Sequence, residues 1–568
     1  MTHDLVIRGG TVVDGTGATA RVADVAVDAD RVTLVGEVDD GGREEIDARG
    51  LIVTPGFVDP HTHLEAQLCW DPDATPSSMH GVTTTLFGMC GFGIAPCADG
   101  GGDYLLRSLE VVEEIPFASS SRGVPFAWHT WPEFLAYLER QTLAVNVGGM
   151  VPHSALRCYV MGDDARERPA TPEERAELAA ELRRSLDGGA LGFATSRGPN
   201  HVDAYQQPVP SRFADHAELA ELVRECHGRP WQINLENKVS TEADLITAEV
   251  EVYARWTREA GARMTWSPFF AEPSESVWRA VIDHNDRLNA DVEVRPQVSP
   301  YPITATLRFD GTDLTPVAGW ETAMEHFPGM TGEERKRHLA DPAVRDLVRE
   351  ATARYDATPV EQRPYPAVPP RYGEWIVIGG APHAALGFTL TELGERAGTG
   401  EADVLCDLAA NDLSFELQVP LVNVDPDQAA ALSAVPGTLI GLGDAGAHVA
   451  TVANYMYPTA MLAGLVRDTG TYTIESAVRR LTSDPARFFG VPARGELRPG
   501  AFADVCVIDF DRLAVTRTEM RNDLPGGARR LYRGATGYAA VVVNGQVTIR
   551  DDALTGARPG KAVRPTDR

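Results

Sequence analysis

The sequence predicts an α/β protein, a (β/α)8 TIM barrel with a small β-sandwich domain built from both termini. Two observations lead to this fold class. Short apolar runs alternate with helical stretches through the middle of the chain, and a repeated β-then-α order implies a parallel sheet. Both ends instead carry strand-like runs separated by turns. Neither end alone has enough strands to bury a core, so we expect the two to assemble together.

A closed barrel is favoured over a doubly wound open sheet, which is the alternative. A barrel of this kind takes about 250 residues before insertions, and the chain has 568. No glycine-rich nucleotide fingerprint follows the first strand, which weakens the open-sheet alternative.

The terminal segments predict the strands of the sandwich. Apolar and β-branched runs that end in turns lie at 5–7, 11–13, 503–509 and 540–543. We therefore expect residues 1–54 and 488–568 to form the sandwich, and residues 55–487 to form the barrel.

The barrel elements are expected from the alternating pattern between the two ends. Six short apolar runs predict buried strands at 82–87, 142–147, 190–194, 231–235, 264–267 and 438–442. Helical patterns, several preceded by capping residues, lie at 173–186, 216–226, 242–260 and 390–397.

Residues 300–375 interrupt this pattern with proline and charge. Helical patches at 332–339 and 344–355 lie within the interruption. We interpret it as an insertion over the barrel mouth, which acts either as a lid or as a surface excursion without a functional role.

Composition excludes several function classes. The formal charge of −29 argues against nucleic acid, whose phosphates require a basic surface. No apolar run approaches the roughly 20 residues that span a bilayer, and the first residues lack a secretion signal. We expect a cytoplasmic protein that acts on a small molecule, without membrane or nucleic-acid partners, and we leave a homo-oligomer open. The seven scattered cysteines do not form a disulfide framework.

The strongest chemical signal is the run LIVTPGFVDPHTH at 51–63, in which an apolar strand ends in His61 and His63. Residues two apart on a strand share a face, with Cα atoms roughly 6–7 Å apart. Their imidazoles can therefore converge on one ion, and the C-terminal end of a barrel strand is where active sites of this fold lie.

A second signal is the run HGVTTTLFGMCGFG at 80–93, which brings Cys90 into a glycine-rich turn at the end of a strand. A thiolate binds zinc well. The alternative is a packed free cysteine without a functional role.

A third signal is the run TLIGLGDAGAH at 438–448, where an apolar strand ends in Asp444 and His448 follows. A carboxylate here could ligate the ion and accept a proton from an attacking water molecule. A carboxylate that caps a helix would give the same pattern.

Together with their surroundings, these runs resemble the amidohydrolase superfamily and, within it, the N-acyl-D-amino-acid deacylase (D-aminoacylase) group. The resemblance covers almost the whole chain. Its segments are VIRGGTVVDGTG at 6–17, TPGFVD at 54–59, CGF at 90–92, HSALR at 153–157, GALGF at 189–193, TSDPA at 482–486, RGEL at 494–497, VNG at 543–545 and TGARPG at 555–560. The resemblance implies a barrel joined to a β-sandwich from both ends, and metal ligands at His61, His63, Cys90 and Asp444, with Asp444 catalytic.

The resemblance also exposes departures. The histidine ligands that it implies at the ends of the fifth and sixth strands are replaced by Asn234 and Pro268, and a lysine of the substrate-carboxylate clamp is replaced by Phe270. We therefore expect about one zinc ion, with Glu236 or Glu65 as candidate substitute ligands. A carbamylated lysine is not expected, because the lysine near the barrel, Lys238, lies beyond the fifth strand.

Other polar residues near the expected mouth are candidates for substrate binding: His153, Arg157, Arg197, His201 and His448. An arginine there could hold a carboxylate through two hydrogen bonds. An ordinary loop residue is the alternative for each. We assign His129, His284, His326 and His338 to the surface or to packing.

The predicted reaction is hydrolysis of an amide bond in a small N-acylated amino acid or related compound. The ion polarises the carbonyl and activates water, and Asp444 takes the proton and passes it to the leaving amine. Alternatives are a cyclic-amide, ester or lactone hydrolase or a lyase on the same scaffold, or a catalytically inactive binding protein.

Overall fold

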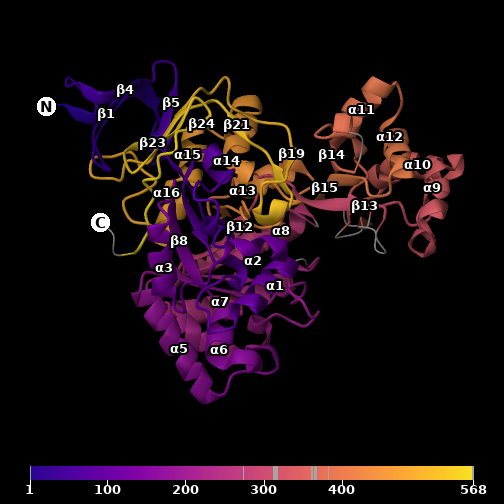
Figure 1. Ribbon diagram of the computed structural model, residues 1–568, viewed down its shortest axis with the longest axis horizontal. Helices are drawn as coiled ribbons and strands as arrows, with labels where there is room; N and C mark the ends of the chain where they lie inside the picture. The colour runs from indigo at the N-terminus through magenta and orange to yellow at the C-terminus, as the bar shows by residue number, and fades with distance from the viewer. Residues whose placement is uncertain are drawn as a thin grey trace.

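The computed structural model describes residues 2–238, 240–272, 274–310, 317–359, 362–363, 367–380 and 383–565. It divides into a parallel barrel, a sheet built from both ends of the chain and an insertion that stands away from both (Figure 1). Within the described residues, no helix has the length and apolar character needed to cross a bilayer.

The barrel is an eight-stranded parallel sheet in the order β16-β12-β11-β10-β9-β8-β7-β6. Its strands are β6 (Phe57–Asp59), β7 (Val82–Phe87), β8 (Asn146–Pro152), β9 (Gly192–Ser196), β10 (Pro230–Asn234), β11 (Arg263–Phe269), β12 (Val294–Val298) and β16 (Leu439–Ile440). A parallel bridge between Thr62 and Ala445 joins the two outer strands just past their ends. Two backbone hydrogen bonds support this closure: the amide of His63 donates to Ala445 at 2.8 Å and that of Asp444 donates to His61 at 3.1 Å.

Helices cover the outside of the barrel, as their apolar stripes predict. They are α1 (Gly102–Val112), α2 (Phe117–Gly123), α3 (Trp131–Arg140), α4 (His153–Met161), α5 (Pro172–Asp187), α6 (His216–Glu225), α7 (Ala243–Ala260), α8 (Glu275–Leu288), α13 (Pro426–Ser433), α14 (Tyr457–Ala460), α15 (Ile474–Leu481) and α16 (Ser483–Phe489). The predicted helices at 173–186, 216–226 and 242–260 are confirmed as α5, α6 and α7. Thr171 begins α5 with a capping box to Glu174, which explains the sharp start.

Two barrel strands differ from the prediction. The third spans Asn146–Pro152 and not residues 142–147. Thr142 has a φ of 51°, which a strand does not adopt. Gly148 and Gly149, which are poor strand formers in isolation, extend the strand because they leave room for neighbouring side chains. A Cβ on Gly148 would lie 2.7 Å from Leu191. The seventh strand, β12, was not predicted, because Arg295 and Gln297 interrupt its apolar pattern.

The second part is a nine-stranded sheet in the order β24-β23-β22-β17-β5-β1-β2-β3, with β4 beside β1. Its strands are β1 (His3–Val12), β2 (Arg21–Asp28), β3 (Arg31–Gly36), β4 (Gly42–Asp47), β5 (Ile52–Pro55), β17 (Val505–Ile508), β22 (Tyr538–Val543), β23 (Gln546–Arg550) and β24 (Ala553–Leu554). Strand β5 pairs with β1 and with β17, so the two ends of the chain share one sheet. The predicted β domain from both termini is confirmed, and its boundaries at residues 54 and 488 stay a prediction. Short pairs β18 (Ala514–Val515) with β21 (Ala535–Thr536), and β19 (Glu519–Arg521) with β20 (Arg530–Tyr532), lie nearby in sequence.

The insertion between β12 and β16 has a sheet of its own, in the order β13-β15-β14. Its elements are β13 (Ile303–Arg308), α9 (Gly332–Ala340), α10 (Pro342–Ala357), β14 (Ile376–Gly379), α11 (Leu390–Ala397), α12 (Glu401–Asn411) and β15 (Glu416–Val422). Its core extends from Leu307 to Val419 around Trp320 and Trp375, well beyond the expected limit at residue 375. The expected helix at 390–397 therefore belongs to the insertion and not to the barrel.

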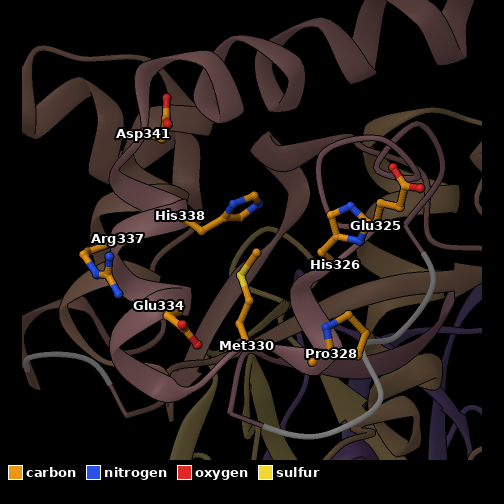
Figure 2. Close-up of a pocket in the computed structure, with 9 residues that line it drawn as sticks. Glu325, His326, Pro328, Met330, Glu334, Arg337, His338 and Asp341 are labelled. Carbon is orange, nitrogen blue, oxygen red and sulfur yellow. The ribbon is translucent and has the colours of Figure 1, made fainter.

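The insertion carries a surface hollow of about 770 Å³ between α9 and the segment before it (Figure 2). His326 and His338 face the hollow with Met330 between them. His338 Nε2 lies 2.6 Å from the carbonyl oxygen of Ala323. The hollow is on the outer part of the insertion, so it is not the site at the barrel mouth.

Candidate metal centre at the barrel mouth

The predicted metal-binding side chains come from three strand ends at the barrel mouth. His61 and His63 follow β6, Cys90 follows β7 and Asp444 follows β16. Cys90 and Asp444 have positive φ angles of 54° and 45°. This backbone region is disfavoured for side-chain-bearing residues and is found repeatedly at functional sites.

These side chains lie close together. His61, His63 and Cys90 each offer a ligand atom within 4.8 Å of the others. His61 Nε2 lies 3.5 Å from Cys90 Sγ and 3.4 Å from Asp444 Oδ1. His63 Nε2 lies 4.0 Å from the same carboxylate oxygen. Ligand atoms around one zinc ion are about 3.3–3.6 Å apart in tetrahedral geometry, so most of these spacings suit a shared ion.

A hydrogen bond orients His61 for coordination. Its Nδ1 lies 2.6 Å from Oε1 of Gln297 on β12, which requires the proton to be on Nδ1. Nε2 is then unprotonated and faces Cys90 and Asp444. Such second contacts to a metal-binding histidine fix its tautomer and ring orientation.

The donor set fits a metal ion of the zinc type. Two imidazoles, a thiol and a carboxylate are ligands that zinc takes in proteins. Nδ1 of His63 is buried without a hydrogen-bond partner among the described residues. Burial, together with the charges of Glu113 and Asp444, raises the pKa of Cys90, so a cation beside it is needed to hold the thiolate.

The ends of β10 and β11 contribute no ligand atom. Asn234 accepts a hydrogen bond from Lys238 Nζ at 2.8 Å through Oδ1, so its amide nitrogen faces Cys90 Sγ at 3.8 Å. Pro268 has no ligating side chain, and Phe270 is buried. The departures expected at these positions are therefore present in the structure.

Neither of the two candidate substitute ligands joins the cluster. Strand β10 ends at Asn234, so the two-residue alternation that would turn Glu236 inward is lost. Glu236 is largely exposed and lies 3.9 Å from Arg197. Glu65 is buried, with both carboxylate oxygens unpartnered among the described residues. Burial and the nearby charge of Glu113 raise the pKa of Glu65 to about 8.

Sequence reasoning missed Glu113, which follows α1 and enters the centre from the loop after β7. It is 3% exposed. Its Oε2 lies 3.6 Å from His63 Nε2 and 3.7 Å from His448 Nε2. Nothing in the pattern LEVVEEIP at 109–116 separates Glu113 from Glu114, because a residue at a helix end can point in either direction.

His448 lies at the mouth, in the loop after β16. Its Nδ1 lies 3.5 Å from Glu114 Oε2. Burial alone would lower its pKa, but the hydrogen bond to Glu114 and the charges of Glu113, Glu114 and Asp444 outweigh burial and raise the pKa to about 9. His448 is therefore a cation near neutral pH.

His201 also lies at the mouth. Its Nδ1 is 2.7 Å from Ser196 Oγ at the end of β9, and its ring packs edge-on against Phe92. Burial and the nearby positive charges of Lys238 and His448 lower its pKa well below the usual range. A neutral imidazole in this place suits the predicted contact with substrate.

Three of the residues predicted to bind substrate form ion pairs or hydrogen bonds within the protein. His153 and Arg157 are fully buried, and both pair with Glu218 on α6: His153 Nε2 at 2.9 Å from Oε1, and Arg157 through Oε2. Arg197 donates to the carbonyl of Ala214 at 2.8 Å. We therefore correct the interpretation of His153 and Arg157: they support the loops behind the site and have no surface left for substrate.

The buried pair predicts a large effect on stability. Replacing Glu218 with alanine leaves Arg157 buried and unpaired, which costs about 3–5 kcal/mol. The matched control is Glu221→Ala on the same helix, which breaks a more exposed pair with Arg175 that contributes about 0–1 kcal/mol. Urea unfolding followed by tryptophan fluorescence measures both. Equal shifts in the two variants would contradict the role of the buried pair.

Comparison with known proteins identifies a family for this chain. The sequence matches the amidohydrolase family over residues 44–315 and 419–549. It is 26% identical to a D-aminoacylase of Alcaligenes xylosoxydans xylosoxydans, over 99% of this chain and 98% of the relative.

Two similar solved structures agree in fold. One is a D-aminoacylase described with a binuclear metal centre, with a TM-score of 0.65 and 24% identity over 99% of this chain and 100% of the other. The second is an N-acyl-D-glutamate deacylase from Bordetella bronchiseptica in complex with zinc and a phosphonate inhibitor, with the same score, identity and coverage. The internal gap in the family match, residues 316–418, falls within the insertion. The chain belongs to the amidohydrolase family.

Proposed function

We propose that this protein hydrolyses the amide bond of a small N-acylated amino acid with the help of a bound metal ion. The observation that carries the proposal is the convergence of His61, His63, Cys90 and Asp444 at the mouth of the barrel. The similarity to a D-aminoacylase supports a hydrolase that acts on carbon–nitrogen bonds other than peptide bonds.

His61, His63 and Asp444 would hold the ion, with Cys90 as a further ligand. We propose about one zinc ion per chain, because Asn234 and Pro268 leave a second ion short of ligands. When bound, zinc would polarise the substrate carbonyl and make water acidic enough to react near neutral pH.

Asp444 is the proposed proton carrier. Its carboxylate lies beside both histidines and keeps about 15% of its side chain exposed, so it can meet both the ion and an incoming water molecule. It takes the proton of the attacking water and delivers it to the leaving nitrogen. A positioned carboxylate in this role contributes about 100- to 10,000-fold to the rate.

Lys238 is the proposed anchor for the substrate carboxylate. Its amino group donates a hydrogen bond to Oδ1 of Asn234. Among the described residues, no carboxylate lies within ion-pair distance of this amino group. Burial lowers the pKa of Lys238 to about 8, although the charges of Cys90 and Glu113 oppose the shift. An arriving carboxylate would keep this ammonium group charged.

Replacing Lys238 with methionine tests the anchor. A hydrogen bond between charged groups contributes about 1.5–3 kcal/mol, so kcat/KM for an N-acyl amino acid should fall about 10- to 100-fold, mainly through KM. An N-acyl amine without a carboxylate should be hydrolysed equally by both proteins. Lys336→Met, on the insertion, is the matched control. A similar loss for both substrates would contradict the anchor.

A substrate panel tests the function itself. Zinc-loaded protein is incubated with the D and L enantiomers of N-acyl amino acids, with cyclic amides and with lactones, and release of amine or acid is measured. We expect the N-acyl amino acids to react fastest. Turnover confined to cyclic amides or lactones would replace this proposal with the corresponding ring-opening activity, and no turnover of any class would favour an inactive binding protein.

A further inference from the structure

We propose that Glu113 is a direct ligand of the metal ion, supplied by the loop after β7 where β10 and β11 supply none. The inference rests on the proposed metal-dependent function. It adds a carboxylate ligand beside His63.

The distances around Glu113 indicate space for an ion. Its Oε2 lies 3.6 Å from His63 Nε2 and 3.7 Å from His448 Nε2. Both separations exceed a side-chain hydrogen bond. The separation from His63 matches the spacing of about 3.3–3.6 Å between two ligand atoms on one zinc ion.

The burial of Glu113 also indicates a bound cation. The Glu113 side chain is 5% exposed, and none of the described residues donates a hydrogen bond to its carboxylate. A buried carboxylate without a hydrogen-bonded partner is costly. A metal ion between Glu113 and His63 would compensate this charge and would also use the lone pair of the imidazole.

The local backbone holds Glu113 in place. Its amide donates to Leu109 at 2.9 Å as α1 ends, and its carbonyl accepts from the amide of His448 at 2.5 Å. The loop that carries Glu113 is thereby tied to the loop that carries Asp444. The next residue, Glu114, has a φ of 52° and turns outward to His448 and Thr451.

The rival explanation is that Glu113 serves only as an ion-pair partner of His448. Three variants separate the two. Glu113→Gln removes the charge with little change in shape, Glu114→Gln is the neighbouring control that also contacts His448, and His448→Gln removes the ion pair while keeping the Glu113 carboxylate.

Metal affinity is the readout, measured by competition with a chromophoric chelator and independently of turnover. We expect Glu113→Gln to bind zinc at least about 10-fold more weakly, since even partners behind the ligands change affinity about 10- to 100-fold. Its cobalt-substituted form should show an altered visible absorption spectrum. Glu114→Gln and His448→Gln should keep the wild-type affinity and spectrum.

The outcomes are separable. If Glu113→Gln binds zinc as tightly as wild type, or if it and His448→Gln weaken binding equally, Glu113 is not a ligand. If wild-type protein binds no zinc, the proposed function and this inference both fail. Should Glu113→Gln not fold, the crystal structure of zinc-loaded wild type decides: a Glu113 oxygen within about 2.0–2.2 Å of the ion supports the inference, and a longer distance overturns it.

Discussion

Replacing His61 with alanine should remove the bound metal ion and lower kcat/KM by at least about 1,000-fold, because Lewis-acid activation contributes several kcal/mol to the transition state. His61 lies at the centre of the cluster, in contact with both Cys90 Sγ and Asp444 Oδ1. His61 is buried, and alanine offers no atom that can bind the ion. Zinc content by elemental analysis and turnover of an N-acyl amino acid measure the two effects.

The matched control is His129→Ala, which removes a largely exposed histidine from the loop before α3. It should keep both zinc and activity. Circular dichroism must show that His61→Ala is folded, so that loss of metal is not loss of structure. A folded His61→Ala protein with full zinc content and wild-type turnover would overturn the proposed centre.

Most of the barrel could be predicted from sequence because buried parallel strands leave a strong signal. The run at 82–87 is apolar or β-branched throughout, and it forms β7 without a shift. The exceptions follow from residues whose role depends on their neighbours. Gly148 and Gly149 lie in β8 because Leu191 and Phe87 fill the space above them, and a single sequence carries no trace of that packing.

The candidate site was predictable where strand ends fix direction. His61 and His63 lie just past β6, which pairs with β7, and the segment that carries them is hydrogen-bonded to Asp444 and Ala445, so their spacing predicted their convergence. Glu113 and Lys238 lie in loops, where spacing says nothing about direction. His153 and Arg157 show the opposite error: their position near the mouth was anticipated, but the buried Glu218 that pairs with them comes from α6.

Replacing Asp444 with asparagine should lower kcat by about 100- to 10,000-fold, the range for loss of a positioned acid–base group. Asparagine has nearly the same shape and adopts positive φ more readily than most residues, so the backbone at φ 45° should be preserved. The amide cannot accept a proton from water, although its oxygen can still face the ion. Activity should therefore fall much further than zinc content, which elemental analysis of the same sample measures.

A control with the same chemistry lies elsewhere in the chain. Asp551 also has a positive φ, 48°, but it is exposed in the turn between β23 and β24. Asp551→Asn therefore repeats the substitution and the backbone conformation without the site, and it should leave kcat unchanged. If Asp444→Asn loses zinc and activity in the same proportion, Asp444 acts only as a ligand, and proton transfer must be assigned to another group at the mouth. If it loses neither, the carboxylate has no part in the reaction, because the amide cannot carry the proton that hydrolysis has to move.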